Sequence, residues 1–273
     1  MSRQDAESAK GSPRPLSLQH RKPRTVDSDN PWHNGGVSPR AVFFDMDDTL
    51  LDTSGGVQES WRAVCQAFGP ELGCDPEDLN TAIRHQMMEF WKDEAAVEHW
   101  RTRLHDARAH NIGNALAAKK LNAGYAKALS DRYWDEQSNR MKLFDDALET
   151  LDRLRDAGFR LALLTNGPAE MQRWKLARVP IAERVDVVVI EGEFGHGKPD
   201  ARVFQHALAS VGANPDEAWH VGDNLYADIQ GAQGAGIHAT WIHRDRLELK
   251  ADDPAVPDRV IGHLAELREA LGL

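Results

Sequence analysis

Two aspartates stand directly after a short apolar run near the start of the chain. Residues 41–44 read Ala-Val-Phe-Phe, and Asp45, Met46 and Asp47 follow at once. A carboxylate can attack phosphorus and form an aspartyl-phosphate, and a second carboxylate can protonate the leaving oxygen and later take a proton from water. The pair is therefore suited to phosphoryl transfer, although two aspartates in a turn are also common as caps or solvated charges.

Further side chains with phosphate-binding or metal-binding chemistry follow later apolar runs. They are Thr165 and Asn166 after residues 161–164, Lys198 after residues 185–190, and Asp223 and Asp228 after residues 218–221. A lysine ammonium can hold a phosphate as a point charge, and carboxylates supply the oxygen ligands that Mg²⁺ prefers. Ligands of open parallel sheets bind outside the carboxyl ends of the strands, so these groups are expected to meet at one edge.

The elements that must position these groups are predicted strands and helices in alternation. The continuous apolar run at 41–44 is typical of a strand that is buried on both faces of a parallel sheet, and weaker runs of this kind occur at 161–164, 185–190, 218–221 and 237–242. Helical patterns lie between them and end at glycines, and Asp200 stands where an N-cap belongs. The alternation predicts an α/β fold with a doubly wound, Rossmann-like parallel sheet.

A long stretch interrupts that rhythm after the first strand. Asp45 and Thr165, which end the first two predicted strands, lie 120 residues apart. A βαβ unit needs only about 30 residues or somewhat more. The intervening residues have helical spacing and a clear helix start at Asp75-Pro76-Glu77. We therefore expect an α/β core of residues 40–52 and 143–273 and an inserted all-helical cap of residues 53–142.

Composition restricts the broad class of the protein. The chain has 273 residues, 41% of them hydrophobic and 28% charged, with a formal net charge of −10. The negative charge argues against nucleic-acid and acidic membrane partners, and no apolar run is long enough to span a membrane.

Residues 1–39 contain five of the 13 prolines and are predicted to be a disordered tail. The tail lacks the apolar stretch of a secretory signal, so a cytoplasmic location is expected. Cys65 and Cys74 are expected to be free thiols.

Taken together, the motifs resemble those of the haloacid dehalogenase superfamily. Members of that superfamily carry hhhhDxDxT, in which h is apolar, then a Ser or Thr that closes the next strand, a Lys shortly before a helix, and an acidic motif GDxxxxD. The matching residues here are Asp45, Asp47 and Thr49, then Thr165, then Lys198, and finally Gly222, Asp223 and Asp228. Four motifs in this order are far more specific than any one of them.

The resemblance implies a catalytic role for each matching residue. Asp45 would be the nucleophile, and Asp47 the general acid and base. Thr165 and the backbone N–H of Asn166 would hydrogen-bond the phosphoryl oxygens, and Lys198 would hold the nucleophile and the phosphate together.

The resemblance also implies Mg²⁺ as cofactor. The ion would be bound by the Asp45 carboxylate, the Asp47 backbone carbonyl and the Asp223 carboxylate. Asp228 would support this site, or would serve simply as a cap or ion-pair partner. The ion would neutralise charge between the nucleophile and the phosphate, which otherwise repel each other.

The function expected from the resemblance is hydrolysis of small-molecule phosphate monoesters, such as sugar phosphates, nucleotides or phosphoglycolate. Dehalogenases of the superfamily lack an acid/base aspartate at the position of Asp47, because halide leaves without a proton. Two alternatives remain open at this point: a phosphomutase similar to β-phosphoglucomutase, and a non-catalytic binding protein. Basic residues of the expected cap are candidates to bind the substrate, namely Arg62, Arg84, Lys92, Arg101 and Arg103. The sequence does not define the oligomeric state.

Overall fold

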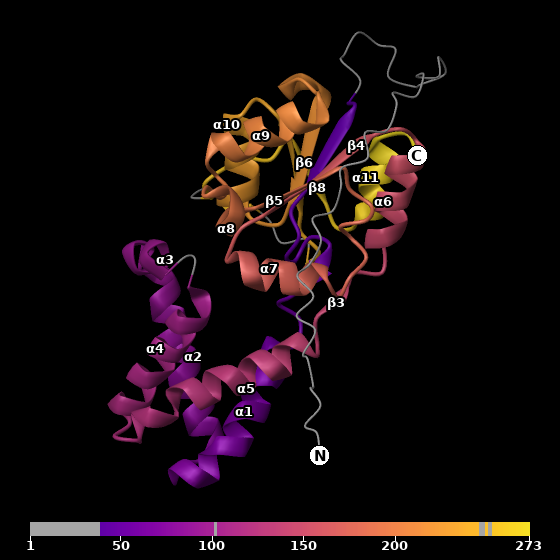
Figure 1. Cartoon of the computed structure of the whole chain (residues 1–273). Helices are drawn as coiled ribbons and strands as arrows, with labels where there is room; N and C mark the ends of the chain where they lie inside the picture. Colours follow the sequence, from indigo (N-terminus) through magenta and orange to yellow (C-terminus); the bar gives the residue numbers. More distant parts are fainter. Residues whose placement is uncertain (1–38, 101–102, 246–248, 251–252) are drawn as a thin grey trace, which may run out of the picture.

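The computed structural model describes residues 39–100, 103–245, 249–250 and 253–273 (Figure 1). The tail predicted to be disordered, residues 1–39, lies outside the described residues except for Pro39, and so does the candidate Arg101. Both cysteines are free, as expected. Among the described residues, no helix has the length and apolar character needed to cross a membrane.

A parallel sheet of six strands forms the centre of the described core, in the order β5-β4-β1-β6-β7-β8. The strands are β1 (Ala41–Phe44), β4 (Arg160–Thr165), β5 (Val187–Ile190), β6 (Ala218–Gly222), β7 (His238–Ile242) and β8 (Arg259–Ile261). Every neighbouring pair is parallel. The predicted doubly wound sheet is confirmed, and β8 is an addition that the sequence did not reveal. Two of its three residues, Arg259 and Val260, are exposed, so its pattern lacks the apolar run of a central strand.

Helices cover both faces of this sheet (Figure 1). Alternate residues of β1 point to opposite faces: Val42 and Phe44 join one buried cluster, and Ala41 and Phe43 join the other. The first cluster is covered by α6 (Ala147–Asp156) and α11 (Leu264–Ala270), and the second by α9 (Ala201–Val211), the π-helix η3 (Leu225–Gln230) and α10 (Gly231–Gly234). The β1 residues of both clusters are fully buried, which explains why the first predicted strand gave the clearest sequence signal.

Two further helices and a 3₁₀ turn complete the described core, namely α7 (Ala169–Leu176), α8 (Glu191–Phe194) and η2 (Pro215–Glu217). The predicted N-cap of α9 is present, because the Asp200 side chain accepts a hydrogen bond from the Arg202 backbone N–H. Gly212 ends the same helix with a φ of 70°, a left-handed conformation that favours glycine.

Helices fill the segment between the first two strands of the sheet. They are α1 (Val57–Leu72), α2 (Pro76–Lys92), α3 (Glu94–Trp100), α4 (Leu104–Ala118), the 3₁₀ turn η1 (Ala123–Tyr125) and α5 (Ala126–Ser138). These helices share a buried cluster that includes Trp61, Val64, Ile83 and Leu129. They lie apart from the sheet in Figure 1, where they are drawn in purple and magenta.

The two chain connections to this helical segment run side by side. The short strands β2 (Leu51–Asp52) and β3 (Lys142–Leu143) pair in antiparallel fashion at the junction. The buried Gln137 links α5 to the first connection, because its Nε2 donates to the carbonyl oxygens of Thr53 and Gly55 at 2.7 and 3.1 Å. Its Oε1 accepts from the Ser60 hydroxyl of α1 at 2.8 Å.

Candidate functional site

The carboxyl edge of the sheet holds a cavity of about 190 Å³, and every residue to which the sequence gave a catalytic or metal role lines it. The cavity is lined by Asp45, Asp47, Asp48, Thr165, Asn166, Lys198, Asp223, Asn224, Ala227 and Asp228. These residues end or follow β1, β4 and β6, except for Lys198, which precedes α9. The fold therefore brings together residues that are far apart in the sequence, at the edge where ligands of such sheets bind. The basic candidates Arg62, Arg84, Lys92 and Arg103 of the helical segment do not line this cavity.

Asp45 continues the line of β1 into the cavity. Its backbone N–H donates to the carbonyl oxygen of Val221 at 2.9 Å, which fixes the aspartate beside the end of β6. The side chain is almost fully buried, and Oδ1 accepts from Lys198 Nζ at 2.6 Å. Burial raises the pKa of the Asp45 carboxyl to about 7, against the opposing attraction of the Lys198 ammonium.

Lys198 is 2% exposed and contacts two carboxylates. Its Nζ donates to Asp45 Oδ1 and to Asp228 Oδ1, both at 2.6 Å. Burial alone would lower the pKa of Lys198, but the charges of Asp228 and Asp45 hold it well above its usual value. The Asn166 side chain fixes the loop: it accepts from the Lys198 backbone N–H and donates to the Lys198 carbonyl oxygen, both at 2.8 Å. The lysine is thus held as a buried cation beside Asp45.

Asp228 lines the cavity and is almost fully buried. His220 Nε2 lies 2.9 Å from Asp228 Oδ1, and the Asn224 backbone N–H donates to Asp228 Oδ2 at 3.1 Å. Burial would raise the pKa of Asp228, but Lys198 and His220 hold it well below the usual range. A Cβ at Gly222 would overlap the Asp228 carboxyl, so the glycine of this motif leaves room for the aspartate. His220 had no sequence signal, because it occupies a position inside the predicted strand 218–221.

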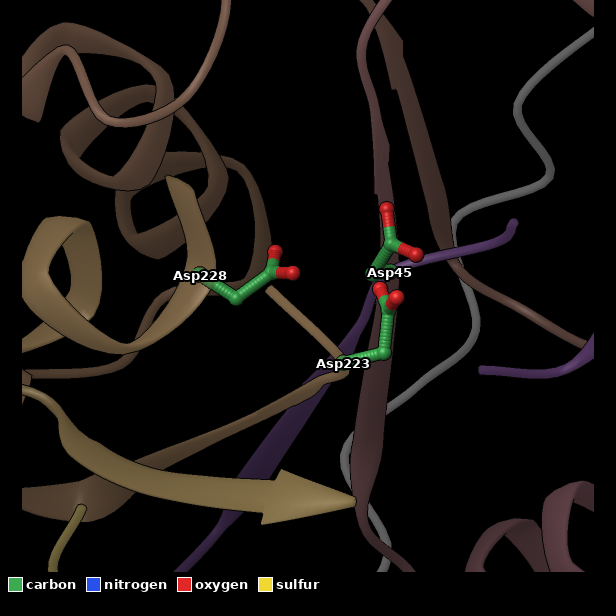
Figure 2. Close-up of side chains that lie close together, drawn as sticks. All are labelled: Asp45, Asp223 and Asp228. Carbon is green, nitrogen blue, oxygen red and sulfur yellow. The ribbon is translucent and has the colours of Figure 1, made fainter. Parts of the chain in front are cut away.

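Three carboxylates of the cavity lie close enough to share a cation. Asp45, Asp223 and Asp228 each offer an oxygen, and these oxygens lie within 4.8 Å of one another. Figure 2 shows the three carboxyl groups turned toward one another. Burial, followed by repulsion from Asp45 and Asp228, raises the pKa of Asp223 to about 8. Asp45 Oδ2 is buried and has no hydrogen-bond partner among the described residues. An unpartnered acceptor within an excess of negative charge fits a divalent cation with oxygen ligands.

Asp47 contacts two residues of α7 that the sequence analysis missed. Lys175 Nζ donates to Asp47 Oδ1 and Oδ2 at 2.8 and 2.7 Å. Gln172 Nε2 donates to Asp47 Oδ2 at 3.1 Å and to Thr165 Oγ1 at 3.0 Å. The two residues are three apart and share one helix face, but the sequence does not reveal which group that face contacts.

Comparisons with known proteins agree with this geometry. A family model described as "haloacid dehalogenase-like hydrolase" matches residues 39–236. A phosphoserine phosphatase of Thermus thermophilus is 42% identical over 149 residues, which cover 54% of this chain and 58% of that protein. A glyceraldehyde 3-phosphate phosphatase of Methanopyrus kandleri is 33% identical over 238 residues, which cover 85% of this chain and 97% of that protein. The solved structure of a 2-haloacid dehalogenase from Pseudomonas syringae pv. Tomato DC3000 has 28% identity and a TM-score of 0.58, covering 86% of this chain and 98% of that one.

Proposed function

Because this chain belongs to the haloacid dehalogenase-like hydrolase family, we propose that it is a Mg²⁺-dependent phosphatase of small-molecule phosphate monoesters with Asp45 as its nucleophile. One observation carries the assignment. A buried carboxylate at the end of β1 has one oxygen on the Lys198 ammonium and the other without a partner among the described residues. Such a carboxylate is oriented by a cation and keeps a lone pair for attack.

The proposed reaction consists of two displacements at phosphorus. In the first, an oxygen of Asp45 forms a bond to phosphorus while the bond to the leaving oxygen breaks, and Asp47 gives that oxygen a proton. In the second, water attacks the aspartyl-phosphate, Asp47 takes the water proton, and the Asp45 carboxylate leaves. The Thr165 hydroxyl, the Asn166 backbone N–H and the Lys198 ammonium hold the phosphoryl oxygens.

The acidic cluster would hold the cofactor of this reaction. We assign Mg²⁺ to the Asp45 and Asp223 carboxylates and the Asp47 backbone carbonyl, with Asp228 in support. The bound ion would neutralise the charge between the nucleophile and the phosphate. Lys198 and His220 hold Asp228 from the protein side, so it keeps less lone-pair capacity for a metal than Asp223.

Asp47 favours phosphoryl transfer over dehalogenation. An alkoxide must be protonated as it leaves, whereas halide needs no proton, so an acid/base aspartate serves only the first reaction. The relatives named above are a phosphoserine phosphatase and a glyceraldehyde 3-phosphate phosphatase. They support esters of small, polar metabolites as the substrate class, with residues 53–142 acting as a cap that covers the leaving group.

Phosphate release tests the proposal directly. The wild type and Asp45→Asn are compared on phosphoserine, glyceraldehyde 3-phosphate, phosphoglycolate, nucleotides and p-nitrophenyl phosphate, with Mg²⁺ and with excess EDTA. We expect metal-dependent release by the wild type and none by Asp45→Asn, because an amide cannot attack phosphorus. Circular dichroism establishes that the variant is folded. Wild-type turnover by a folded Asp45→Asn would reject the nucleophile, and full activity in EDTA would reject the metal.

A further inference from the structure

Lys175, on helix α7, contacts the carboxylate of Asp47 directly. Lys175 is 7% exposed, and burial of an ammonium is costly unless it is paired. Its Nζ lies within 2.8 Å of both oxygens of Asp47. Because a single ammonium holds both oxygens, the contact limits the rotation of the aspartate side chain in addition to balancing its charge.

Gln172 adds a second restraint to the same carboxylate. The residue is buried, and its amide nitrogen shares two N–H groups among three acceptors, namely Asp47 Oδ2, the Thr165 hydroxyl and the Asn166 carbonyl oxygen. Gln172 thus connects Asp47, the proposed acid/base group, to Thr165, which is proposed to hold the phosphoryl oxygens. Gly167 leaves room for it, since a Cβ there would lie 3.2 Å from Gln172 Nε2, and its φ of 115° also favours glycine.

The helix that carries both residues is anchored on two sides. Leu176 of α7 packs into the hydrophobic cluster of the core. Trp174 contacts Trp134 of α5, with ring centroids 5.1 Å apart, so α7 lies between the sheet and the helical segment (Figure 1). Side chains on such an anchored helix can fix a catalytic group in space better than side chains on an exposed loop can.

We propose that Lys175 and Gln172 are positioning residues that hold the Asp47 carboxyl in the orientation required for proton transfer. This inference rests on the proposed function, in which Asp47 is the general acid and base. Neither residue reacts with substrate, and both act through the aspartate. Misplacement of a reacting group by about 1 Å can cost about 100-fold in rate, so the loss of these contacts is expected to be large.

The test compares two esters that differ in their need for a proton. Benzyl phosphate releases a strongly basic alkoxide, whereas p-nitrophenyl phosphate releases a weakly basic phenolate. For Lys175→Met we expect kcat/KM to fall by about 10- to 100-fold on benzyl phosphate and by less than about threefold on p-nitrophenyl phosphate. The matched control is Arg173→Met, which removes a cation from the same helix. Arg173 pairs with Glu193 at 2.7 Å instead of with Asp47, and this variant should leave both values unchanged.

A double-mutant cycle separates positioning from a general structural effect. Lys175→Met is introduced into Asp47→Asn, and benzyl phosphate turnover is measured with both single variants beside it. If Lys175 acts through Asp47, the double variant should match Asp47→Asn within about twofold. Gln172→Leu, tested on the same two esters, should show the same selectivity with a smaller loss, and it serves as a second test if Lys175→Met does not fold.

The outcomes distinguish this inference from the proposed function. Two results would overturn the positioning role while leaving an active phosphatase. One is an equal fall of kcat/KM on both esters for Lys175→Met. The other is a fall in the Asp47→Asn background as large as the fall that Lys175→Met causes in the wild type. No release by the wild type from these two esters or from the metabolite esters of the first experiment would overturn the proposed function and this inference with it.

Discussion

Two cationic side chains, one at the edge of the sheet and one in the helical segment, differ in the groups that they contact. Lys198 at the sheet edge donates to Asp45 and Asp228. Arg108 of α4, in the helical segment, has its guanidinium 4.7 Å from the centre of the Tyr133 ring. Its Nη1 is inaccessible to solvent and has no hydrogen-bond partner among the described residues. Lys198 thus has two carboxylate partners, whereas Arg108 lies against an aromatic ring.

The pKa values of the two cations shift in opposite directions for this reason. Burial lowers the pKa of Arg108, and only its contact with Tyr133 opposes the shift. For Lys198 the two aspartates outweigh burial and raise the pKa. The charges at the sheet edge, Lys198 with Asp45, Asp223 and Asp228, thus form a coupled set in which the lysine opposes the repulsion among the carboxylates, whereas the partly buried Arg108 has only a ring contact to oppose the cost of its burial.

The largest stability effect that tests this contrast is expected from Lys198→Met. The substitution leaves Asp45 and Asp228 buried without their cation, and breaking a buried ion pair in this way typically costs about 3–5 kcal/mol. We expect that loss in metal-free protein at pH 8, measured by urea denaturation followed by circular dichroism. The loss should shrink at pH 5.5, where the carboxyls can take up protons. A loss below about 1 kcal/mol at pH 8 would contradict the idea of a coupled set.

The raised pKa values of Asp45 and Asp223 make the stability of the protein depend on pH. The pKa values of Asp45 and Asp223 are raised to about 7 and about 8 in the folded protein, whereas unfolded carboxyls ionise near pH 4. The native state therefore binds more protons than the unfolded state between about pH 4 and pH 8. Metal-free protein should lose stability as the pH rises through this window and lose no more above it. Stability from the lowered pKa of Asp228 is lost only at more acidic pH.

Magnesium should reverse this loss, because it binds the ionised carboxylates. We expect saturating Mg²⁺ to raise the melting temperature more at pH 8 than at pH 5.5, as measured by thermal denaturation. Asp223→Asn is the control, and it should show both a shallower decline with pH and a smaller response to Mg²⁺. Equal slopes for the two proteins would remove Asp223 from the coupled set.

The sequence predicted the residues that end strands, for a physical reason. Asp45, Thr165 and Asp223 follow apolar runs that must be buried on both faces of a sheet, and parallel strands end at a common edge. Lys175 and Gln172 lie on a helix, and a helix with polar residues on several sides does not show from its sequence which side meets the site.

The contact of Arg108 was equally hidden, since it depends on how two helices cross. Arg108 is on α4 and Tyr133 is on α5, and a charged residue of a helix is expected to face solvent. The angle and offset at which the two helices pack decide this contact, and the pattern of residue types along each helix does not define them.

The smallest effect in this comparison is expected from Arg108→Met. The substitution removes a cation–π contact worth about 0.5–2 kcal/mol and also the cost of keeping a guanidinium out of water, and these two terms oppose each other. The methionine retains part of the apolar packing. We therefore expect the free energy of unfolding to change by less than about 1 kcal/mol in either direction, in the urea experiment used for Lys198→Met. A loss as large as that of Lys198→Met would contradict the contrast, because Arg108 would then stabilise the fold as much as the paired lysine does.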